Sequence, residues 1–215
     1  MNVDLNYFNQ DFFYQAHPQH WQLSFDDKFY DFTCLPNIHL SAMSTAIYAS
    51  HLLKNRLNID EQLWHQANAE VFIPGRFQVI DGPNTVILDV GHNPHAANLL
   101  VERLTSIECG GKLHLVISFL KDKDAHGVVN ILQKMSFLCY PCLLDSKRAC
   151  EMSDLETLFP GEKTYMSPEA ALKAAQAQAK AGDIIVAFGS FHLISPLMQL
   201  FTEEGYDVFR NHRRN

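Results

Sequence analysis

The segment LDVGHNP, residues 88–94, places an acidic, an imidazole and an amide side chain directly after an apolar run. Residues 85–88 are β-branched or aliphatic, which predicts a buried strand. Asn93 is a good N-cap, and Pro94 suits the first position of a helix, where no N–H is needed. The free N–H groups at such a helix start can bind an anion. The segment therefore predicts a ligand-binding loop between a strand and a helix.

A cation is expected close to this loop. Arg76 stands in the sequence GRFQ, residues 75–78, and the turn sequence DGPN, residues 81–84, separates it from the predicted strand. Turn residues of this kind fold two short strands against each other. We therefore expect Arg76 and Asp89 to share one cleft, where a cation and a carboxylate can act on the same ligand.

Short apolar runs alternate with helical stretches from about residue 75 onward. Strands are expected at 86–88, 113–117, 137–144 and 184–188, and helices at 94–104, 125–134 and 168–181. This alternation predicts an α/β fold with a Rossmann-like, mostly parallel sheet and helices on both faces.

Ligands of such sheets gather at the carboxyl ends of the strands. Polar residues follow three of the expected strands, at 89–93, 118–124 and 189–192. Any one of these groups alone is also typical of an ordinary turn or a solvated loop. Together they predict one pocket, with Asp89, Lys123 and Ser190 among its candidates.

Residues 1–72 form a smaller region that is rich in aromatic residues and histidines. Residues 21–25 and 29–33 predict a hairpin around Asp26 and Asp27, and two helices are expected at 41–57 and 59–69. This region is too small to bury a large core alone. We expect apolar surface to remain on it, with self-association or local disorder as the result, and the main candidates are Phe12, Phe13 and Trp21.

Composition limits the class of protein and its partners. A chain of 215 residues that is 47% hydrophobic can bury a real core, and its formal charge of -7 opposes binding to nucleic acid. The basic tail, residues 210–214, is typical of a solvated end. No apolar stretch approaches the roughly 20 residues needed to cross a bilayer, and the N-terminus lacks the plan of a signal peptide. We therefore expect a cytoplasmic protein with neither a nucleic acid nor a membrane partner.

Cysteine and glycine patterns argue against two further classes. The five cysteines form no disulfide framework, and the single CxxC, residues 139–142, lies in an apolar run with no second half of a zinc site. A structural role for this CxxC is favoured. No G-x-G-x-x-G follows a predicted strand, which disfavours a dinucleotide oxidoreductase. No metal site is expected within this chain.

Four motifs carry a resemblance to a known family: IPGRFQ (73–78), DVGHNP (89–94), DKD (122–124) and GSFH (189–192). In this order and at these separations they resemble the C-terminal domain of bacterial folylpolyglutamate synthase/dihydrofolate synthase, a branch of the Mur ligase superfamily. The resemblance extends from about residue 2 to about residue 200. It implies that residues 73–215 are the glutamate ligase domain and that residues 1–72 are a remnant of the central ATPase domain.

The family adds L-glutamate to dihydropteroate or folates. ATP and magnesium activate a carboxylate as an acyl phosphate, which the amino group of glutamate then attacks. The resemblance implies that Arg76 reaches the ATP phosphates and stabilises charge on the transferring phosphoryl group. It also assigns nucleotide-binding positions to Asp89, His92 and Asn93, and to Ser44, which stands where the family commonly has an asparagine.

The resemblance assigns the incoming amino acid to a second set of residues. Lys123 and Ser190 match positions that help hold it in related Mur ligases, and His192 follows in the same motif. A glutamate nucleophile carries carboxylates, which favour a cation and hydroxyl or N–H donors. These positions are therefore the expected substrate-binding residues.

Two departures from the family pattern limit what the resemblance implies. One is Ser44, whose hydroxyl cannot offer the paired donor and acceptor of the asparagine amide. The other is that the chain contains no G-x-x-x-x-G-K-[ST] phosphate loop, and the family keeps its magnesium ligands in the larger region that carries this loop. We therefore expect half of an interdomain active site, without ligase activity of its own. The alternative is a non-catalytic nucleotide or amino-acid binding module, or a degenerate subunit that completes a separate ATPase domain.

Overall fold

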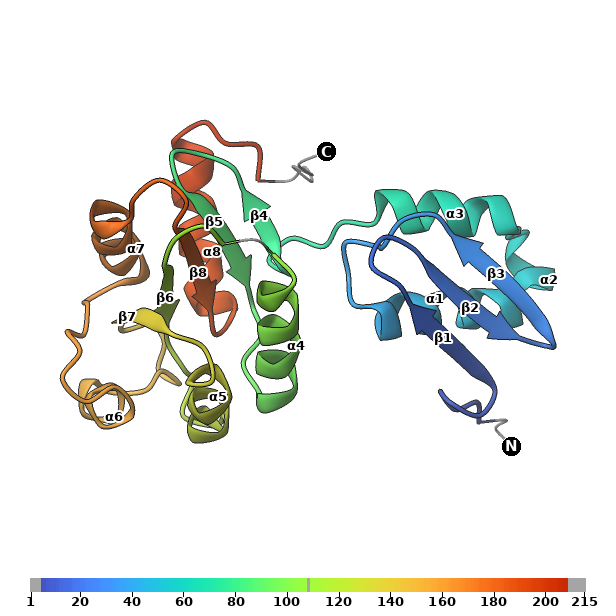
Figure 1. The fold of residues 1–215 in the computed structure, drawn as a ribbon. Coiled ribbons are helices and arrows are strands. Elements are labelled where there is room, and N and C mark those ends of the chain that lie inside the picture. The colour runs from blue at the N-terminus through green and yellow to red at the C-terminus, as the bar shows by residue number, and fades with distance from the viewer. Residues whose placement is uncertain (1–4, 108, 209–215) are drawn as a thin grey trace. The chain divides into compact units, whose positions relative to one another are not determined.

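The computed structural model describes residues 5–107 and 109–208. The chain divides into two compact units, residues 1–73 and 74–215, next to the predicted boundary at 72 and 73 (Figure 1). Which part of a larger enzyme each unit represents stays a prediction. No helix among the described residues is long and apolar enough to cross a membrane. The basic tail singled out in the sequence lies outside the described residues.

The N-terminal unit is an antiparallel three-stranded sheet followed by helices, in the order β1 (Phe12–Ala16), β2 (Trp21–Phe25), β3 (Lys28–Phe32), α1 (Leu40–Leu52), α2 (Lys54–Leu57) and α3 (Glu61–Glu70). The predicted hairpin is confirmed as β2 and β3. Asp26 and Asp27 both have positive φ, which suits a two-residue hairpin turn. Strand β1 was not predicted, and the predicted helix at 41–57 is interrupted at Leu53.

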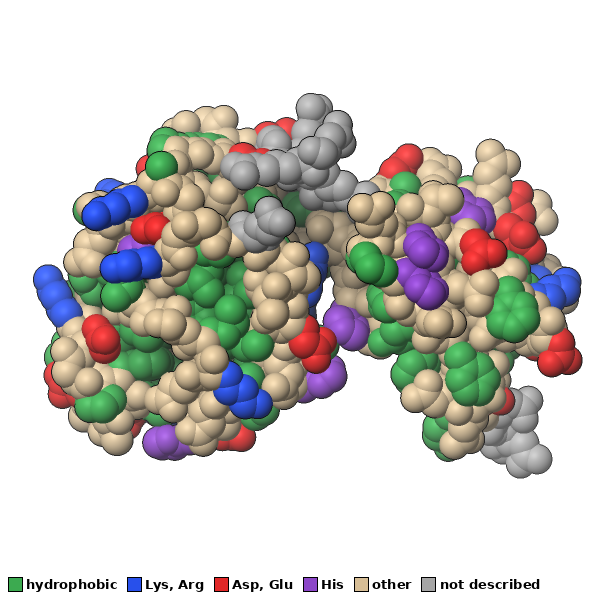
Figure 2. Space-filling model, in the orientation of Figure 1, with side chains coloured by type: hydrophobic (Ala, Val, Ile, Leu, Met, Phe, Trp, Pro, Cys, Tyr) green, Lys and Arg blue, Asp and Glu red, His purple; other side chains and the backbone are tan. Residues whose placement is uncertain are grey.

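The core of this unit is aromatic, and it corrects part of the predicted exposure. Trp21 is completely buried and Phe12 nearly so, because alternate residues of a strand face the same side and the helices of this unit cover that side. Phe13, on the opposite side of β1, is 45% exposed, as predicted. Other hydrophobic side chains also reach the surface of this unit (Figure 2), among them Phe29, Leu52 and Leu57. Self-association through them stays a prediction.

The C-terminal unit contains a five-stranded sheet whose strands, in spatial order, are β4 (Gln78–Ile80), β5 (Thr85–Asp89), β8 (Ile184–Phe188), β6 (Leu113–Ile117) and β7 (Phe137–Pro141). Only β4 pairs in the antiparallel direction, so the predicted mostly parallel sheet is confirmed. The turn at 81–84 joins β4 to β5 as expected.

Helices cover both faces of this sheet, as predicted (Figure 1). One face packs against α4 (Pro94–Thr105), α5 (Ala125–Leu132) and α6 (Met152–Leu158). The other packs against α7 (Pro168–Gln178) and α8 (Phe191–Glu203). Buried side chains alternate between the faces along β8, with Ile185 and Ala187 on one side and Val186 and Phe188 on the other.

In the C-terminal unit, three predicted elements are shorter than expected, among them the helix expected at 125–134, which ends at Leu132, and two helices were missed. The helix expected at 168–181 ends at Gln178, because Ala179 is extended and Asp183 accepts a hydrogen bond from the Lys180 N–H. The strand expected at 137–144 ends at Pro141. The sequence did not predict α6, nor α8, which contains Pro196 in its interior.

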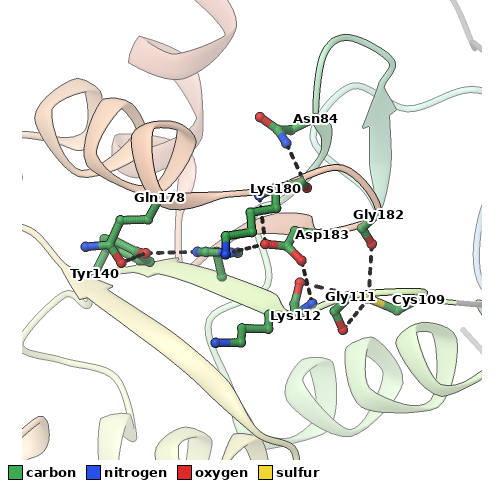
Figure 3. Close-up of polar contacts among 10 residues, drawn as sticks. Asn84, Cys109, Gly111, Lys112, Tyr140, Gln178, Lys180, Gly182 and Asp183 are labelled. Atoms are coloured by element: carbon green, nitrogen blue, oxygen red, sulfur yellow. Dashed lines mark hydrogen bonds and ion pairs between the residues drawn. The ribbon is translucent and has the colours of Figure 1, made fainter.

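A buried polar network connects the strands at the edge of the sheet opposite the predicted site. Asp183 accepts hydrogen bonds from the backbone N–H groups of Lys112 and Lys180 (Figure 3), and its carboxylate lies 3.0 Å from Nε2 of buried His114. Nδ1 of His114 lies 2.8 Å from the Tyr140 hydroxyl. The two N–H donors, and then His114, hold the pKa of Asp183 well below its usual value. The ionised carboxylate therefore fastens the start of β6 to the start of β8.

We expect Asp183→Asn to destabilise the protein at pH 7, because the variant loses a charged acceptor shared by three donors. A carboxyl group with a lowered folded pKa stabilises the fold above its unfolded pKa of about 3.9, and that contribution is lost as pH falls through the folded pKa. In urea unfolding, the difference in the free energy of unfolding between wild type and Asp183→Asn should become steadily smaller below about pH 4.

Asp145→Asn, in an exposed loop, is the matched control and should leave stability unchanged at every pH. A difference between wild type and Asp183→Asn that is independent of pH would show that the carboxylate charge is not what stabilises this network.

Candidate functional site

Three parallel strands, β5, β8 and β6, lie side by side and end at the same edge of the sheet. Phe188 of β8 pairs with Asp89 on one side and with Ile117 on the other, so the loops that follow begin at one level. These are the three polar loops of the sequence prediction, residues 89–93, 118–124 and 189–192. The strand order therefore brings the predicted groups to one edge.

Asp89, the last residue of β5, uses both carboxylate oxygens within the protein. Oδ1 accepts from the Gly91 N–H at 2.7 Å, and Oδ2 accepts from the Phe77 N–H at 3.1 Å. Burial is the main influence on the pKa of Asp89 and raises it, while the two N–H groups and the charges of Arg76 and Arg103 lower it. Asp89 thus connects the loop before β4 to the loop after β5.

Arg76 lies in a loop that is held on several sides. The Gly75 N–H donates to Oε1 of Gln78 at 2.8 Å, and the Gly75 carbonyl accepts from the Val90 N–H at 2.8 Å. Gly75 and Phe77 both have positive φ, so the backbone turns sharply on each side of Arg76. The Arg76 side chain is exposed, and in the part of the chain that the structure describes it has no ion-pair partner. Its guanidinium is therefore available to an anion.

Helix α4 begins as predicted, and its start is better satisfied than the sequence indicated. Asn93 is the N-cap, with Oδ1 accepting from the Ala96 N–H at 2.9 Å, and Pro94 occupies the first turn. The Asn93 carbonyl accepts from the Ala97 N–H. Since Pro94 has no N–H, only His95 in the first turn keeps an N–H that Asn93 does not bind. The expectation of several free N–H groups is therefore wrong, because the cap satisfies most of them.

His92 is half-buried beside this cap. Its Nδ1 lies 3.0 Å from the Val90 carbonyl, which can only accept, so Nδ1 carries the proton. In the neutral ring, Nε2 is then an acceptor. His92 thus has a fixed ring orientation and one nitrogen left for a ligand with a hydrogen-bond donor.

The loop after β6 is internally paired. Nζ of Lys123 lies 3.0 Å from the Asp122 carboxylate, which also accepts from Arg148 at 2.8 Å. Arg148 and then Lys123 lower the pKa of Asp122 to about 2. Asp124 caps α5 by accepting from the Gly127 N–H at 2.8 Å. Lys123, predicted to bind substrate, is therefore already balanced by a carboxylate.

Two buried hydroxyl groups stand at the ends of β6 and β8. Within the described residues, neither Oγ of Ser118 nor Oγ of Ser190 has a hydrogen-bond partner. Ser190 is the N-cap residue of α8, yet its side chain makes no capping bond. A buried hydroxyl without a partner is costly, and a ligand can satisfy it. His192 follows on the first turn of α8 and is exposed.

The last predicted residue, Ser44, belongs to the N-terminal unit. It is completely buried, and its hydroxyl donates to the Ser41 carbonyl at 3.1 Å within α1. Its contact with a nucleotide stays a prediction, and in this structure the hydroxyl is already bonded inside a helix.

One residue of this edge was not singled out from the sequence. Arg103 lies far along α4, away from the polar loops. The guanidinium carbon of Arg103 lies 3.8 Å from the centre of the Phe77 ring. Nothing local in the sequence connects Arg103 with Phe77, because their contact depends on how α4 packs on the sheet.

The cysteines at 139 and 142 fit the structural role that the sequence favoured. Both are free thiols, and burial raises the pKa of Cys139 to about 11 and that of Cys142 to about 12. The reactive species of cysteine is the thiolate. At neutral pH these thiols stay protonated and pack as small apolar side chains.

The fold is an α/β domain whose polar strand-end groups form a candidate ligand-binding edge at its parallel strands. Residues 75–191 match the family described as Mur ligase, glutamate ligase domain. This match covers more than half of the chain, so the chain belongs to that family.

Relatives and solved structures agree with this assignment. The chain is 34% identical to the dihydrofolate synthase/folylpolyglutamate synthase of Buchnera aphidicola subsp. Acyrthosiphon pisum over 77% of its own length, and 32% identical to that of Escherichia coli, also over 77%. It spans 41% and 39% of these two relatives.

Two solved structures match both units. Escherichia coli FolC in complex with DHPP and ADP matches 92% of the chain and 47% of its own, with a TM-score of 0.84 and 29% identity. The Yersinia pestis bifunctional folylpolyglutamate synthase/dihydrofolate synthase complexed with AMPPNP and Mn ion matches 91% of the chain and 47% of its own, with a TM-score of 0.83 and 27% identity.

A substitution at Gly189 tests how closely the ends of β8 and β6 approach each other. A side chain at Gly189 would overlap the Ser118 carbonyl oxygen, so Gly189→Ala must push the ends of β8 and β6 apart. We expect a loss of stability of about 1–3 kcal/mol, as for other overpacked sites, measured by urea unfolding. Gly110→Ala is the control, because no atom lies within 4 Å of the added methyl group. Equal stability of the two variants would contradict the close approach.

Proposed function

We propose that this chain supplies the C-terminal half of the active site of an ATP-dependent ligase that joins L-glutamate to dihydropteroate or folates through an acyl phosphate. The exposed side chain of Arg76 carries this proposal, because it has no ion-pair partner among the described residues and lies on a loop that is hydrogen-bonded to Asp89 at the end of β5. ATP, when bound, supplies the phosphoryl group that activates the carboxylate. Arg76 binds the phosphates and stabilises the charge that develops on them.

The neighbouring groups suit the same ligand. The His95 N–H lies at the start of α4, which is the positive end of the helix dipole and favours an anion. Nε2 of His92 can accept a hydrogen bond from the nucleotide, while Asn93 holds the helix start in place. Asp89 acts mainly through the loop geometry, because both of its oxygens already accept N–H groups.

The amino-acid half of the reaction fits the loops after β6 and β8. The Ser190 hydroxyl, which has no hydrogen-bond partner among the described residues, can donate to a carboxylate of glutamate. His192 lies two residues further along, in the first turn of α8. Lys123 can offer its charge to a second carboxylate by exchanging Asp122 for the ligand. These roles require binding only, and the site orients the glutamate amino group toward the activated carboxylate.

Magnesium ligands are proposed outside this chain. No group of three or more potential metal-ligating side chains was found among residues 5–107 and 109–208. The chain spans about two fifths of its relatives, and a phosphate loop is absent from its sequence. Phosphoryl transfer depends on several positioned groups at once, so we propose that the chain alone has no ligase activity.

The direct experiment restores the remainder of the enzyme in trans. The part of the Escherichia coli relative that this chain does not span is added with ATP, magnesium, L-glutamate and dihydropteroate or a reduced folate, and glutamylated product is measured by mass spectrometry. The mixture should form product, and Arg76→Ala should lower kcat by roughly 10²–10³, as for the loss of one charge-stabilising donor.

Lys173→Ala, which removes an exposed cation on α7, should leave turnover unchanged. Turnover by the unsupplemented chain would contradict its proposed inactivity. Turnover of the mixture that is unaffected by Arg76→Ala would contradict the role of Arg76. If the mixture forms no product but the chain binds ATP or glutamate, a non-catalytic binding module is the better account.

A further inference from the structure

Arg103 lies on α4 with its side chain packed over the loop that carries Arg76. Its guanidinium carbon is 3.8 Å from the centre of the Phe77 ring, well within the distance at which a cation and an aromatic face attract each other. A planar guanidinium can stack on a ring, which an ammonium group cannot do equally. The side chain is half-buried, so it is held at this position instead of moving freely in solvent.

Phe77 is the residue that most needs such support. Its φ of 48° is in the left-handed region, where a non-glycine residue costs on the order of 1–3 kcal/mol unless its surroundings hold it. Two contacts hold it from different directions: its N–H donates to Asp89, and its buried ring packs under Arg103. Because Phe77 directly follows Arg76, its backbone conformation decides where the Arg76 side chain leaves the loop.

Arg103 and Asp89 also face each other electrostatically. Burial lowers the pKa of Arg103 and the charge of Asp89 raises it, while Arg103 in turn lowers the pKa of Asp89. Among the influences on the pKa of Asp89, that of Arg103 is the smallest. The contact that bears on Phe77 is therefore the Arg103 guanidinium over its ring.

We infer that Arg103 is a positioning residue, which fixes Phe77 through its stacked guanidinium and thereby sets the place of Arg76 for phosphate binding. The phosphate-binding part of this inference rests on the proposed function, whereas the fixing of Phe77 does not. If Arg103 only added positive charge near the ligand, its removal would leave the ligand-free loop unchanged. If Arg103 positions Phe77, its removal must change the loop even in the absence of any ligand.

Amide hydrogen exchange of the ligand-free chain tests the fixing of Phe77. Removal of the guanidinium in Arg103→Ala should let the loop open more often, so the Phe77 N–H should exchange at least about tenfold faster, a change of about 1.4 kcal/mol in opening free energy. Amides of β7, such as Tyr140, should be unchanged. Arg103→Lys keeps the charge without the planar stack and should lie between wild type and Arg103→Ala.

Glu102→Gln is the matched control, since Glu102 is an exposed neighbour of Arg103 on α4. In this variant the Phe77 N–H should exchange at the wild-type rate. If Arg103→Ala does not fold, Arg103→Lys alone decides the test. Unchanged Phe77 exchange in a folded Arg103 variant overturns the inference.

Affinity for Mg·ATP, measured by calorimetry on the chain mixed with the complementary part of the Escherichia coli relative, tests the connection to Arg76. Arg103→Ala should weaken binding several-fold in the wild-type background and have no further effect in Arg76→Ala, because the two residues act in series. Equal effects in both backgrounds overturn the positioning role for phosphate. If the complemented mixture binds Mg·ATP equally well with wild type and with Arg76→Ala, the phosphate-binding role of Arg76 fails, while the exchange experiment still decides whether Arg103 fixes Phe77.

Discussion

The carboxylate of Asp89 is the constraint on which the candidate site depends. Its two oxygens accept the N–H groups of Phe77 and Gly91, which come from loops on opposite sides of the β4–β5 hairpin. Without this bridge, the left-handed Phe77 would lose one of its two supports, and Arg76 would no longer have a defined position. A glycine is also required at position 91, because a side chain there would clash with Phe188 and Ala96. A single partly buried carboxylate thus organises the loop of Arg76, the helix start and the strand end.

The sheet provides the rigid support for this arrangement. Strands β5, β8 and β6 end at one level, and the absence of a side chain at Gly189 lets β8 approach the Ser118 carbonyl closely. At the other edge, Asp183 fastens the starts of β6 and β8 through Lys112, Lys180 and His114 (Figure 3). Polar groups therefore connect the strands at both edges, while the interior is apolar. The loops of the candidate site extend from a sheet with little freedom to shift.

Local chemistry made much of this predictable from the sequence. The Asn93 cap, the Pro94 start of α4 and the DGPN turn each depend on a few adjacent residues, and all three were found as expected. The burial of Trp21 was not predicted, because it depends on how the helices of its unit cover one side of β2. Helix α8 was missed because Pro196 lies in its interior, where a proline normally ends a helix.

Side-chain partners were the least predictable part of the site. The sequence places Lys123 beside Asp122, but the addition of Arg148 to the same carboxylate requires the fold. The stacking of Arg103 on Phe77 likewise joins residues on different elements. Motifs indicate which residue types are available, whereas tertiary packing decides which of them are already paired and which are left for a ligand.

A titration with Mg·ATP of the ¹⁵N-labelled chain, mixed with the unlabelled complementary part of the Escherichia coli relative and followed by NMR, is the most direct test of the proposed nucleotide site, because it locates the nucleotide without requiring turnover. We expect shifts centred on the Arg76 loop, residues 75–78, and on the loop and helix start at residues 89–95, with any shift in the N-terminal unit confined to the surroundings of Ser44. The shifts at residues 75–78 and 89–95 should be absent in Arg76→Ala. Shifts centred on the N-terminal unit, or no shifts at concentrations that saturate related ATP sites, would contradict the assignment of this strand end to nucleotide binding.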